Sequence, residues 1–208
     1  MPSFRGYGLD EHPDALRWTR EVTRTTELDL HLTGGEWLRL GGLQARVLTL
    51  PGHSRGQLGL WLPSTGTVLV SDAVLGRAVP DADGHPAFPP TYRFVHDYRA
   101  SIRRLRDLAP KVLATAHYGV FDGPGVWTFL DESLSFTHDL ERALLGFLCT
   151  DGPQTLQRLA ESLSPRMGEW PDGATGAMAF PVAGHLEDLR DRGLVTTDDD
   201  LVPRWRLS

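Results

Sequence analysis

The sequence has little cysteine, no long apolar run and no excess of basic residues. Cys149 is the only cysteine among its 208 residues, which excludes a disulfide framework, a cysteine-based zinc finger and an iron–sulfur cluster. No apolar run reaches the roughly 18 residues that a membrane span needs, and the first twenty residues lack the basic and apolar regions of a secretory leader. We therefore expect a globular protein of a reducing compartment, the cytoplasm, with no membrane partner.

Acidic residues outnumber basic ones along the chain. Lys and Arg together number 21 and Asp and Glu 27, which gives a formal net charge of −6. From residue 138 onward there are seven Arg and no Lys against twelve Asp or Glu. A surface that binds duplex nucleic acid needs clustered basic side chains to neutralise the phosphates. The charge balance therefore argues against a nucleic-acid partner.

The first two thirds of the sequence carries mainly strand patterns. Short alternating or apolar runs between turn residues predict strands, at residues 26–32, 36–40, 43–50, 57–62, 67–71 and 111–115. Pro63-Ser64-Thr65-Gly66 separates the fourth run from the fifth and predicts a hairpin. Residues 81–90 contain three prolines and predict a loop. Helices are expected over residues 12–22, where Pro13 suits the first turn, and over 93–108, where apolar residues recur every three or four positions.

The last third of the sequence is mainly helical. Helical patterns cover residues 126–149, 154–163 and 180–192, and residues 194–207 predict a strand, an Asp198-Asp199-Asp200 turn and another strand. Short helices followed by a hairpin are typical of a winged helix. We therefore expect two domains, residues 1–139 and a smaller α+β domain over 140–208, with a boundary near Leu140. The smaller domain is expected to serve packing, dimerisation or capping of a site.

Three residues that can bind a metal ion stand where predicted strands end. His53 follows an apolar strand and Pro51-Gly52, Asp72 follows the strand that ends at Ser71, and His117 follows another strand and Ala116. Strand ends can converge at one edge of a sheet, and imidazole with carboxylate suits zinc or iron. Each residue alone is more often a turn or cap residue than a metal ligand, so the ordered trio carries the prediction of a metal site.

These residues also carry a resemblance to a known family. Leu50-Pro51-Gly52-His53-Ser54, then Val70-Ser71-Asp72, then Ala116-His117-Tyr118-Gly119 resembles the second half of a metallo-β-lactamase-fold hydrolase, over about residues 26–140. The resemblance implies an α/β sandwich and zinc, with His53 on the first metal ion, Asp72 between two ions and His117 on the second. It also implies a hydroxide, shared by the metals, that attacks an ester, thioester, lactam or phosphodiester. Tyr118 is the expected substrate-binding residue, for a small-molecule substrate of unknown identity.

The sequence departs from that family in one respect. The family's main motif, His-x-His-x-Asp-His, is absent, because no two of the eight histidines stand two positions apart. We therefore expect a sandwich that is incomplete at its N-terminus, either in the gene product itself or through a late start codon. Each metal ion would keep two of the roughly three protein ligands it needs. The expected zinc-dependent hydrolase would thus bind zinc weakly and be weakly active or inactive alone.

The alternative is a non-catalytic pseudoenzyme that acts as an interaction module. Nine apolar residues in the central strands are too many for one buried face of a sheet: Leu48, Leu50, Leu58, Leu60, Trp61, Leu62, Val68, Leu69 and Val70. A contiguous apolar surface normally marks an interface. We therefore expect an uncovered apolar sheet face, an unpaired strand edge and a homo-oligomer that covers them. Zinc content of the purified chain distinguishes the hydrolase from the interaction module.

Overall fold

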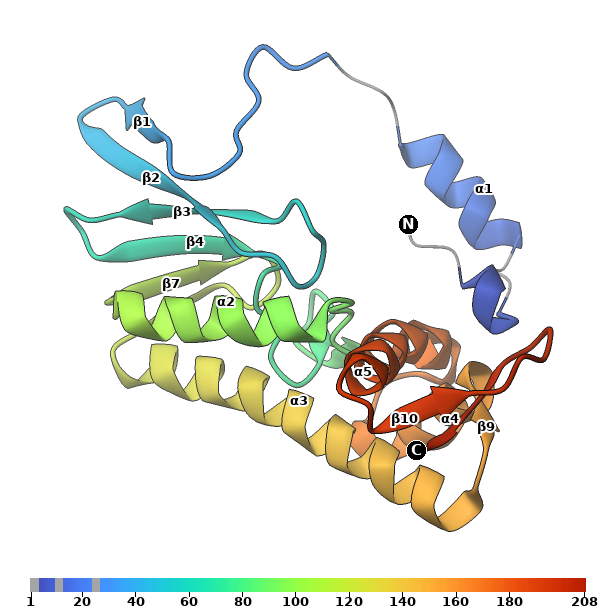
Figure 1. The fold of residues 1–208 in the computed structure, drawn as a ribbon. Helices are drawn as coiled ribbons and strands as arrows, with labels where there is room; N and C mark the ends of the chain where they lie inside the picture. Colours follow the sequence, from blue (N-terminus) through green and yellow to red (C-terminus); the bar gives the residue numbers. More distant parts are fainter. Residues whose placement is uncertain (1–3, 10–12, 24–26) are drawn as a thin grey trace.

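The structure is a computed structural model that describes residues 4–9, 13–23 and 27–208 (Figure 1). A short 3₁₀ helix, η1 (Arg5–Tyr7), and the helix α1 (Pro13–Val22) come first. The predicted helix over residues 12–22 is thus confirmed for its described part. The part of the chain that the structure describes contains no helix long and apolar enough to cross a membrane.

A six-stranded mixed sheet forms the centre of the fold, in the order β1-β2-β3-β4-β7-β8. Its strands are β1 (Trp37–Leu40), β2 (Leu43–Thr49), β3 (Leu58–Leu62), β4 (Thr67–Ser71), β7 (Val112–Thr115) and β8 (Val120–Asp122). Neighbouring strands are antiparallel except β4 and β7, which run parallel because the helix α2 (Val95–Leu108) connects them. The predicted hairpin is confirmed as β3–β4, and five of the six predicted strands are present.

Two helices cover one face of this sheet (Figure 1). The helix α2 places Tyr98, Ile102 and Leu105 against Val68 and other sheet residues in one continuous core. Next to α2 lies α3 (Pro124–Asp151), a helix of 28 residues. No helix lies over the opposite face of the sheet in the described part of the chain. The strands β1 and β8 are the edges of the sheet, so the expected unpaired edges are present.

The C-terminal part is built on the far end of α3. The elements that follow are β9 (Gln154–Thr155), α4 (Leu156–Met167), the 3₁₀ segment η2 (Asp172–Met178), α5 (Ala179–Asp191), β10 (Val195–Thr197) and β11 (Arg204–Leu207). The three short strands form a sheet in the order β10-β11-β9, and fully buried Trp205 joins it to the helices. The expected boundary at Leu140 lies inside α3, so the two parts of the chain share one continuous helix.

Three local predictions differ from the structure. Residues 27–32 form no strand, because they have no neighbouring strand to bond with, and Leu28 and Leu30 are exposed; Thr26 lies outside the described residues. The expected loop at 81–90 includes part of a small hairpin, β5 (Val79–Pro80) with β6 (Pro86–Phe88). The strand β8, which is only three residues long, was not predicted.

The central strands bury more of their apolar residues than expected. Of the nine residues named above, Leu48, Leu50, Leu62, Val68 and Val70 are buried and only Leu69 is exposed, at 41%. Further exposed apolar side chains belong to the edge strands and β2: Trp37, Leu40, Leu43 and Val120. The uncovered apolar surface is therefore concentrated toward the edges of the sheet.

Candidate metal centre

The turn that carries His53 is fixed against the start of α2. The Gly52 carbonyl accepts hydrogen bonds from the backbone N–H groups of Arg93 and Phe94, at 2.9 and 2.8 Å, and the Ser101 hydroxyl donates to the Pro51 carbonyl at 2.7 Å. Gly52 has a φ of +150° and lies so close to Tyr98 that a Cβ atom would come within 2.6 Å of its Cα. Only glycine fits this approach. The Pro-Gly pair therefore sets where His53 lies.

Asp72 directly follows the last residue of β4. That residue, Ser71, has a φ of +49°, an uncommon backbone conformation for a side-chain-bearing residue. Such conformations occur most often at functional sites. The backbone then turns again, with the Ala73 N–H bonded to the Val70 carbonyl at 3.0 Å. The turn places Asp72 just beyond the end of the strand β4.

His117 lies in a tight turn between β7 and β8. The Thr115 N–H and hydroxyl both donate to the Gly119 carbonyl, at 3.0 and 3.1 Å, and the same hydroxyl accepts the Tyr118 N–H at 2.9 Å. The parallel pairing of β4 with β7 sets Ser71 opposite Thr115. The ends of the two strands therefore coincide, and the residues that follow them, Asp72 and His117, become neighbours.

Asp72 and His117, two of the three predicted ligands, are in contact. Asp72 Oδ1 lies 2.9 Å from His117 Nε2, with the two side chains 29% and 44% exposed. The same oxygen is buried and has no hydrogen-bond partner among the described residues, so the contact lacks hydrogen-bond geometry. Two ligand atoms of one tetrahedral zinc ion, each about 2 Å from the metal, lie about 3.3 Å apart, slightly farther than the atoms of this pair. The contact therefore brings two candidate ligand atoms together, in the geometry of an ion pair.

His53 does not form a compact group of ligand atoms with Asp72 and His117. Its Nδ1 atom lies 3.4 Å from the Thr91 hydroxyl. Among the described residues, only one group of three or more candidate ligands has all its ligand atoms within 4.8 Å of one another. That group is Asp81, Asp83 and His85, not the predicted trio. The structure thus brings Asp72 and His117 together, whereas His53 lies in a separate turn.

The exposed Asp81–His85 group has a structural explanation. Asp81 Oδ1 accepts the backbone N–H groups of Asp83 and His85, both at 2.9 Å. An aspartate that bonds to the backbone two residues ahead is a common turn-forming device. This group therefore shapes the tip of the β5–β6 hairpin.

Tyr118 is held by the loop after Asp72. Its hydroxyl donates to the backbone carbonyls of Leu75 and Ala78, the latter at 2.8 Å, and burial raises the pKa of Tyr118 above its usual value. Its ring lines a cavity of about 430 Å³ beside His117. The side chain therefore contributes a wall to this cavity, while its hydroxyl is already used within the protein.

A second cavity touches His53, and local sequence patterns do not predict most of its residues. It has a volume of about 420 Å³ and a mainly apolar lining: His53, Ser54, Arg55, Thr91, Arg93, Phe94 and Phe180. Phe180 belongs to α5 and lies more than 120 residues from His53 in the chain. The one sequence signal for Arg55 is its place two residues after His53, in a turn bounded by Gly52 and Gly56.

Structural comparison connects this arrangement to a known fold. A metallo-beta-lactamase family protein from Thermus thermophilus superposes on 99% of this chain with a TM-score of 0.76 and 28% sequence identity. A beta-lactamase domain protein from Burkholderia ambifaria superposes on 92% of the chain with a TM-score of 0.72 and 20% identity. This chain has the metallo-β-lactamase fold. The resemblance given by the three motifs is confirmed at the level of the fold.

The chain spans less than two thirds of these metallo-β-lactamase-fold proteins, 62% of the first and 56% of the second. Neither the models of protein families nor the curated proteins gave a match to this sequence. Proteins of the metallo-β-lactamase superfamily typically bind metal ions, which agrees with the chemistry of the Asp72–His117 pair.

Proposed function

We propose that this chain is part of a metal-dependent hydrolase, with His53, Asp72 and His117 as ligands of zinc. The observation that carries the proposal is the buried Asp72 Oδ1 atom, which lies 2.9 Å from His117 Nε2 without a hydrogen bond. A buried carboxylate oxygen that accepts no hydrogen bond is costly in a folded protein. A bound cation removes that cost.

The residues around the site have roles that follow from their contacts. The Thr115–Gly119 turn fixes the direction of His117. The Thr91 hydroxyl next to His53 Nδ1 holds the ring so that Nε2 is available as a ligand. When bound, zinc lowers the pKa of a water molecule and stabilises negative charge on a substrate oxygen. The reaction class supported by this donor set is hydrolysis of an ester, thioester, lactam or phosphodiester.

The number of ligands predicts a weak site. Two metal ions that share three protein ligands have about two each, whereas a stable zinc site with an open position has about three. We therefore expect zinc to be lost on dialysis and hydrolysis of simple esters to be slow. Two zinc ions per chain that survive dialysis would contradict this expectation.

Zinc titration of two variants tests the ligand assignment. Asp72→Asn removes the charge of the proposed bridging ligand, and we expect the zinc affinity to fall by more than about tenfold, since even loss of an outer partner costs 10–100-fold. Asp107→Asn, an exposed aspartate on α2, is the matched control. Equal zinc affinity in the two variants would overturn the assignment of Asp72.

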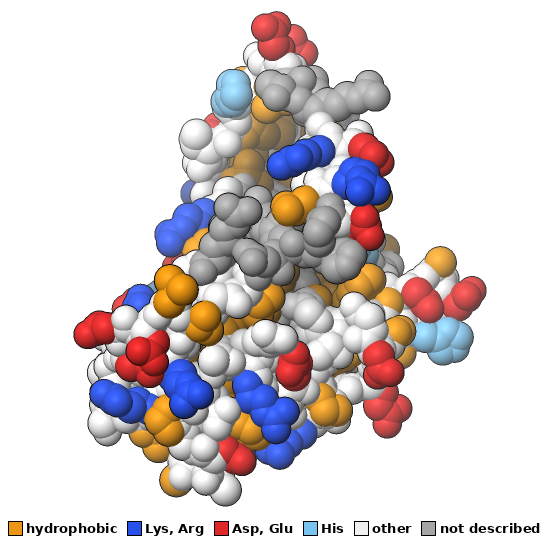
Figure 2. All heavy atoms as spheres, turned by 90° about the vertical axis from the view of Figure 1, so that its right-hand side faces the viewer, with side chains coloured by type: hydrophobic (Ala, Val, Ile, Leu, Met, Phe, Trp, Pro, Cys, Tyr) orange, Lys and Arg blue, Asp and Glu red, His pale blue; other side chains and the backbone are white. Residues whose placement is uncertain are grey.

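We also propose that the C-terminal part is a winged-helix-like unit. The order of its elements supports this interpretation, because α3, β9, α4 and α5 are followed by the β10–β11 hairpin, and β9 joins the same sheet. On the face in Figure 2, basic and acidic side chains are interspersed, which accords with the expected absence of a nucleic-acid partner. The proposed role of the C-terminal part is to pack on α2 and cap the site.

A second function, an interaction module without catalysis, is favoured by the open sheet face. Leu40 and Val120 are 46% and 68% exposed on the edge strands, and Leu69 is 41% exposed on the same face between them. Such a surface suits a second copy of the chain or another protein. Light scattering together with metal analysis distinguishes the two functions, because an oligomer that binds no zinc at micromolar concentrations supports only the interaction module.

A further inference from the structure

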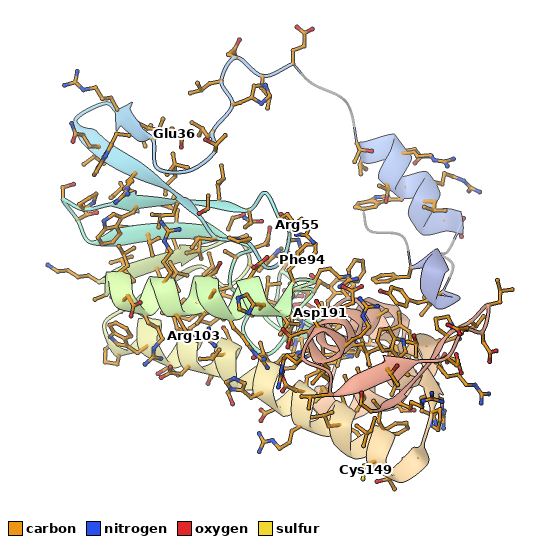
Figure 3. All side chains as sticks on the ribbon, in the orientation of Figure 1. Glu36, Arg55, Phe94, Arg103, Cys149 and Asp191 are labelled. Atoms are coloured by element: carbon orange, nitrogen blue, oxygen red, sulfur yellow. The ribbon has the colours of Figure 1, made fainter. Side chains whose placement is uncertain are left out.

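The cavity beside His53 is assembled from three separate parts of the chain. The turn after Gly52 supplies His53, Ser54 and Arg55, the residues before α2 supply Arg93 and Phe94, and α5 supplies Phe180. In Figure 3, Arg55 and Phe94 lie side by side at the N-terminal end of α2, with Arg103 farther along that helix. The C-terminal part therefore completes a pocket whose other walls surround a proposed metal ligand.

The two arginines of this cavity differ in how their charge is used. Arg93 is buried, 7% exposed, and both terminal nitrogens of its guanidinium donate to the Glu187 carboxylate. Its Nε atom is buried and has no hydrogen-bond partner among the described residues. The charge of Arg93 is thus balanced within the protein, and its unpaired Nε atom is buried, so Arg93 does not offer a free cation to the cavity.

Arg55 is exposed and stacks on an aromatic wall of the cavity. Its guanidinium carbon lies 4.2 Å from the centre of the Phe94 ring, and no salt bridge of Arg55 occurs in the described part of the chain. Arg55 also lines an adjoining depression with Asp97, Asp188 and Asp191. Asp188 and Asp191 lie 3.0 Å from Arg192 and 3.8 Å from Arg190, and no ion pair joins Asp97 to Arg55 in the described part of the chain. Stacking holds the guanidinium flat and leaves its N–H groups free for a planar anion.

We propose that this pocket binds an organic carboxylate, with an apolar body against Phe94 and Phe180 and its carboxylate group at Arg55. That the cleavable bond of a bound substrate lies near His53 rests on the proposed function, whereas binding of the carboxylate in the pocket does not depend on it. A guanidinium matches the two oxygens of a carboxylate, and aromatic walls bind an aryl or alkyl body. The pocket thus favours a carboxyl-bearing ester, thioester or lactam over a phosphodiester.

Isothermal titration of the chain, stripped of metal with EDTA and then dialysed free of the chelator, tests the carboxylate site. The probes are 4-phenylbutanoate and its neutral counterpart 4-phenylbutan-1-ol. We expect Arg55→Gln to raise the Kd for the carboxylate about tenfold through loss of a charge-assisted contact, and to leave the Kd for the alcohol unchanged. Arg103 is an exposed arginine on α2, the helix that begins after Phe94, and Arg103→Gln should change neither Kd.

The apolar wall is tested separately. Phe180→Ala should raise the Kd for both probes, because it removes contact with the part that they share. Phe94→Leu reports on the opposite wall and replaces Phe180→Ala if circular dichroism shows that variant to be unfolded. The proposal is overturned if Arg55→Gln and Arg103→Gln bind the carboxylate equally, or if neither wall variant affects either probe. Because these titrations contain no metal, the zinc titration of Asp72→Asn can fail or succeed independently.

Discussion

Residues that face each other across the central strands form two rows, one on each side of the sheet. Trp61, Val68, Leu113 and Phe121 pair from β3 to β8 and belong to the core under α2 and α3, where Val68 and Leu113 are fully buried. Leu60, Leu69, Ala114 and Val120 form the row on the other side. Exposure in that second row reaches 41% at Leu69 and 68% at Val120.

The comparison of the two rows shows that apolar composition does not decide which face of a sheet is covered. Both rows are almost entirely apolar. They lie on opposite faces because successive side chains of a strand point to opposite sides of the sheet. The first row is buried because α2 follows β4 and returns across one side before β7 begins. The second row has no such element. Leu69 and Val120 of that row are available for contact with another protein surface, whereas Val47, which pairs with Leu60, is fully buried.

The largest expected effect comes from truncating a leucine of the covered row. Leu113→Ala should lower the free energy of unfolding by about 2–5 kcal/mol, because it removes buried contacts and leaves a cavity. Leu69→Ala, the matched change in the open row, should cost about 1 kcal/mol or less, since its side chain is already partly exposed. Urea denaturation of both variants measures the difference. Similar losses would mean that the open face is also covered in solution.

Acid should lower the free energy of unfolding through protonation of His185, which links α5 to Tyr92 beside the start of α2. This side chain is fully buried on α5, with Nε2 3.0 Å from the Tyr92 hydroxyl, and burial holds its pKa well below the usual value. The unfolded chain therefore binds a proton more readily, so stability is complete above about pH 6.5 and falls as the pH decreases, by at most about 1.4 kcal/mol per pH unit.

Urea denaturation between pH 8 and 5 checks this dependence. The His185→Gln variant should lose most of it, whereas His96→Gln, an exposed histidine on α2, should retain it. A slope that is identical in the wild-type chain and His185→Gln would exclude His185 as the source.

The open row should cause self-association. At micromolar concentrations, we expect the mass from light scattering to exceed the 23.0 kDa of one chain. Leu69→Lys should shift the distribution toward the monomer with little loss of stability, since a charge on an exposed apolar face disfavours burial against a partner. Leu201→Lys, at a leucine that is 97% exposed elsewhere, is the control. A monodisperse wild-type monomer would contradict the expectation.

The smallest effect concerns the turn that leads into the edge strand β1. The Glu36 carboxylate accepts hydrogen bonds from the Thr33 N–H and hydroxyl and from the Gly34 N–H, at 2.7, 2.8 and 2.7 Å. These bonds, first those from Thr33, lower the pKa of Glu36 to about 2. Their contribution is complete above the usual pKa of the carboxyl group, about 4.3, and is lost as the pH falls through about 2.

An NMR titration of the Thr33 and Gly34 amide signals measures this change. The midpoint should lie near pH 2, and the Glu36→Gln variant should show no such transition. A midpoint near the usual value for glutamate would indicate that the turn is open in solution.

Most of the strands and helices could be predicted from local patterns. Glycine and proline bound the strands β2, β3 and β4, and a period of three to four residues marks α2, so these elements needed no knowledge of their partners. The alternation at 27–32 failed as a predictor because a strand exists only when another strand satisfies its backbone groups. The strand β8 was missed for the converse reason, since three residues show no pattern and pairing with β7 creates it.

The sequence by itself determined which residues end the strands, and therefore identified His53, Asp72 and His117 as candidate ligands in a resemblance that the fold comparison supports. The tertiary structure alone decided that Asp72 and His117 come within 2.9 Å, because that contact requires β4 and β7 to pair in parallel register. It also decided that Arg55, Phe94 and Phe180 share one cavity. Local patterns encode backbone conformation, whereas the meeting of distant side chains depends on how helices and strands pack after they form.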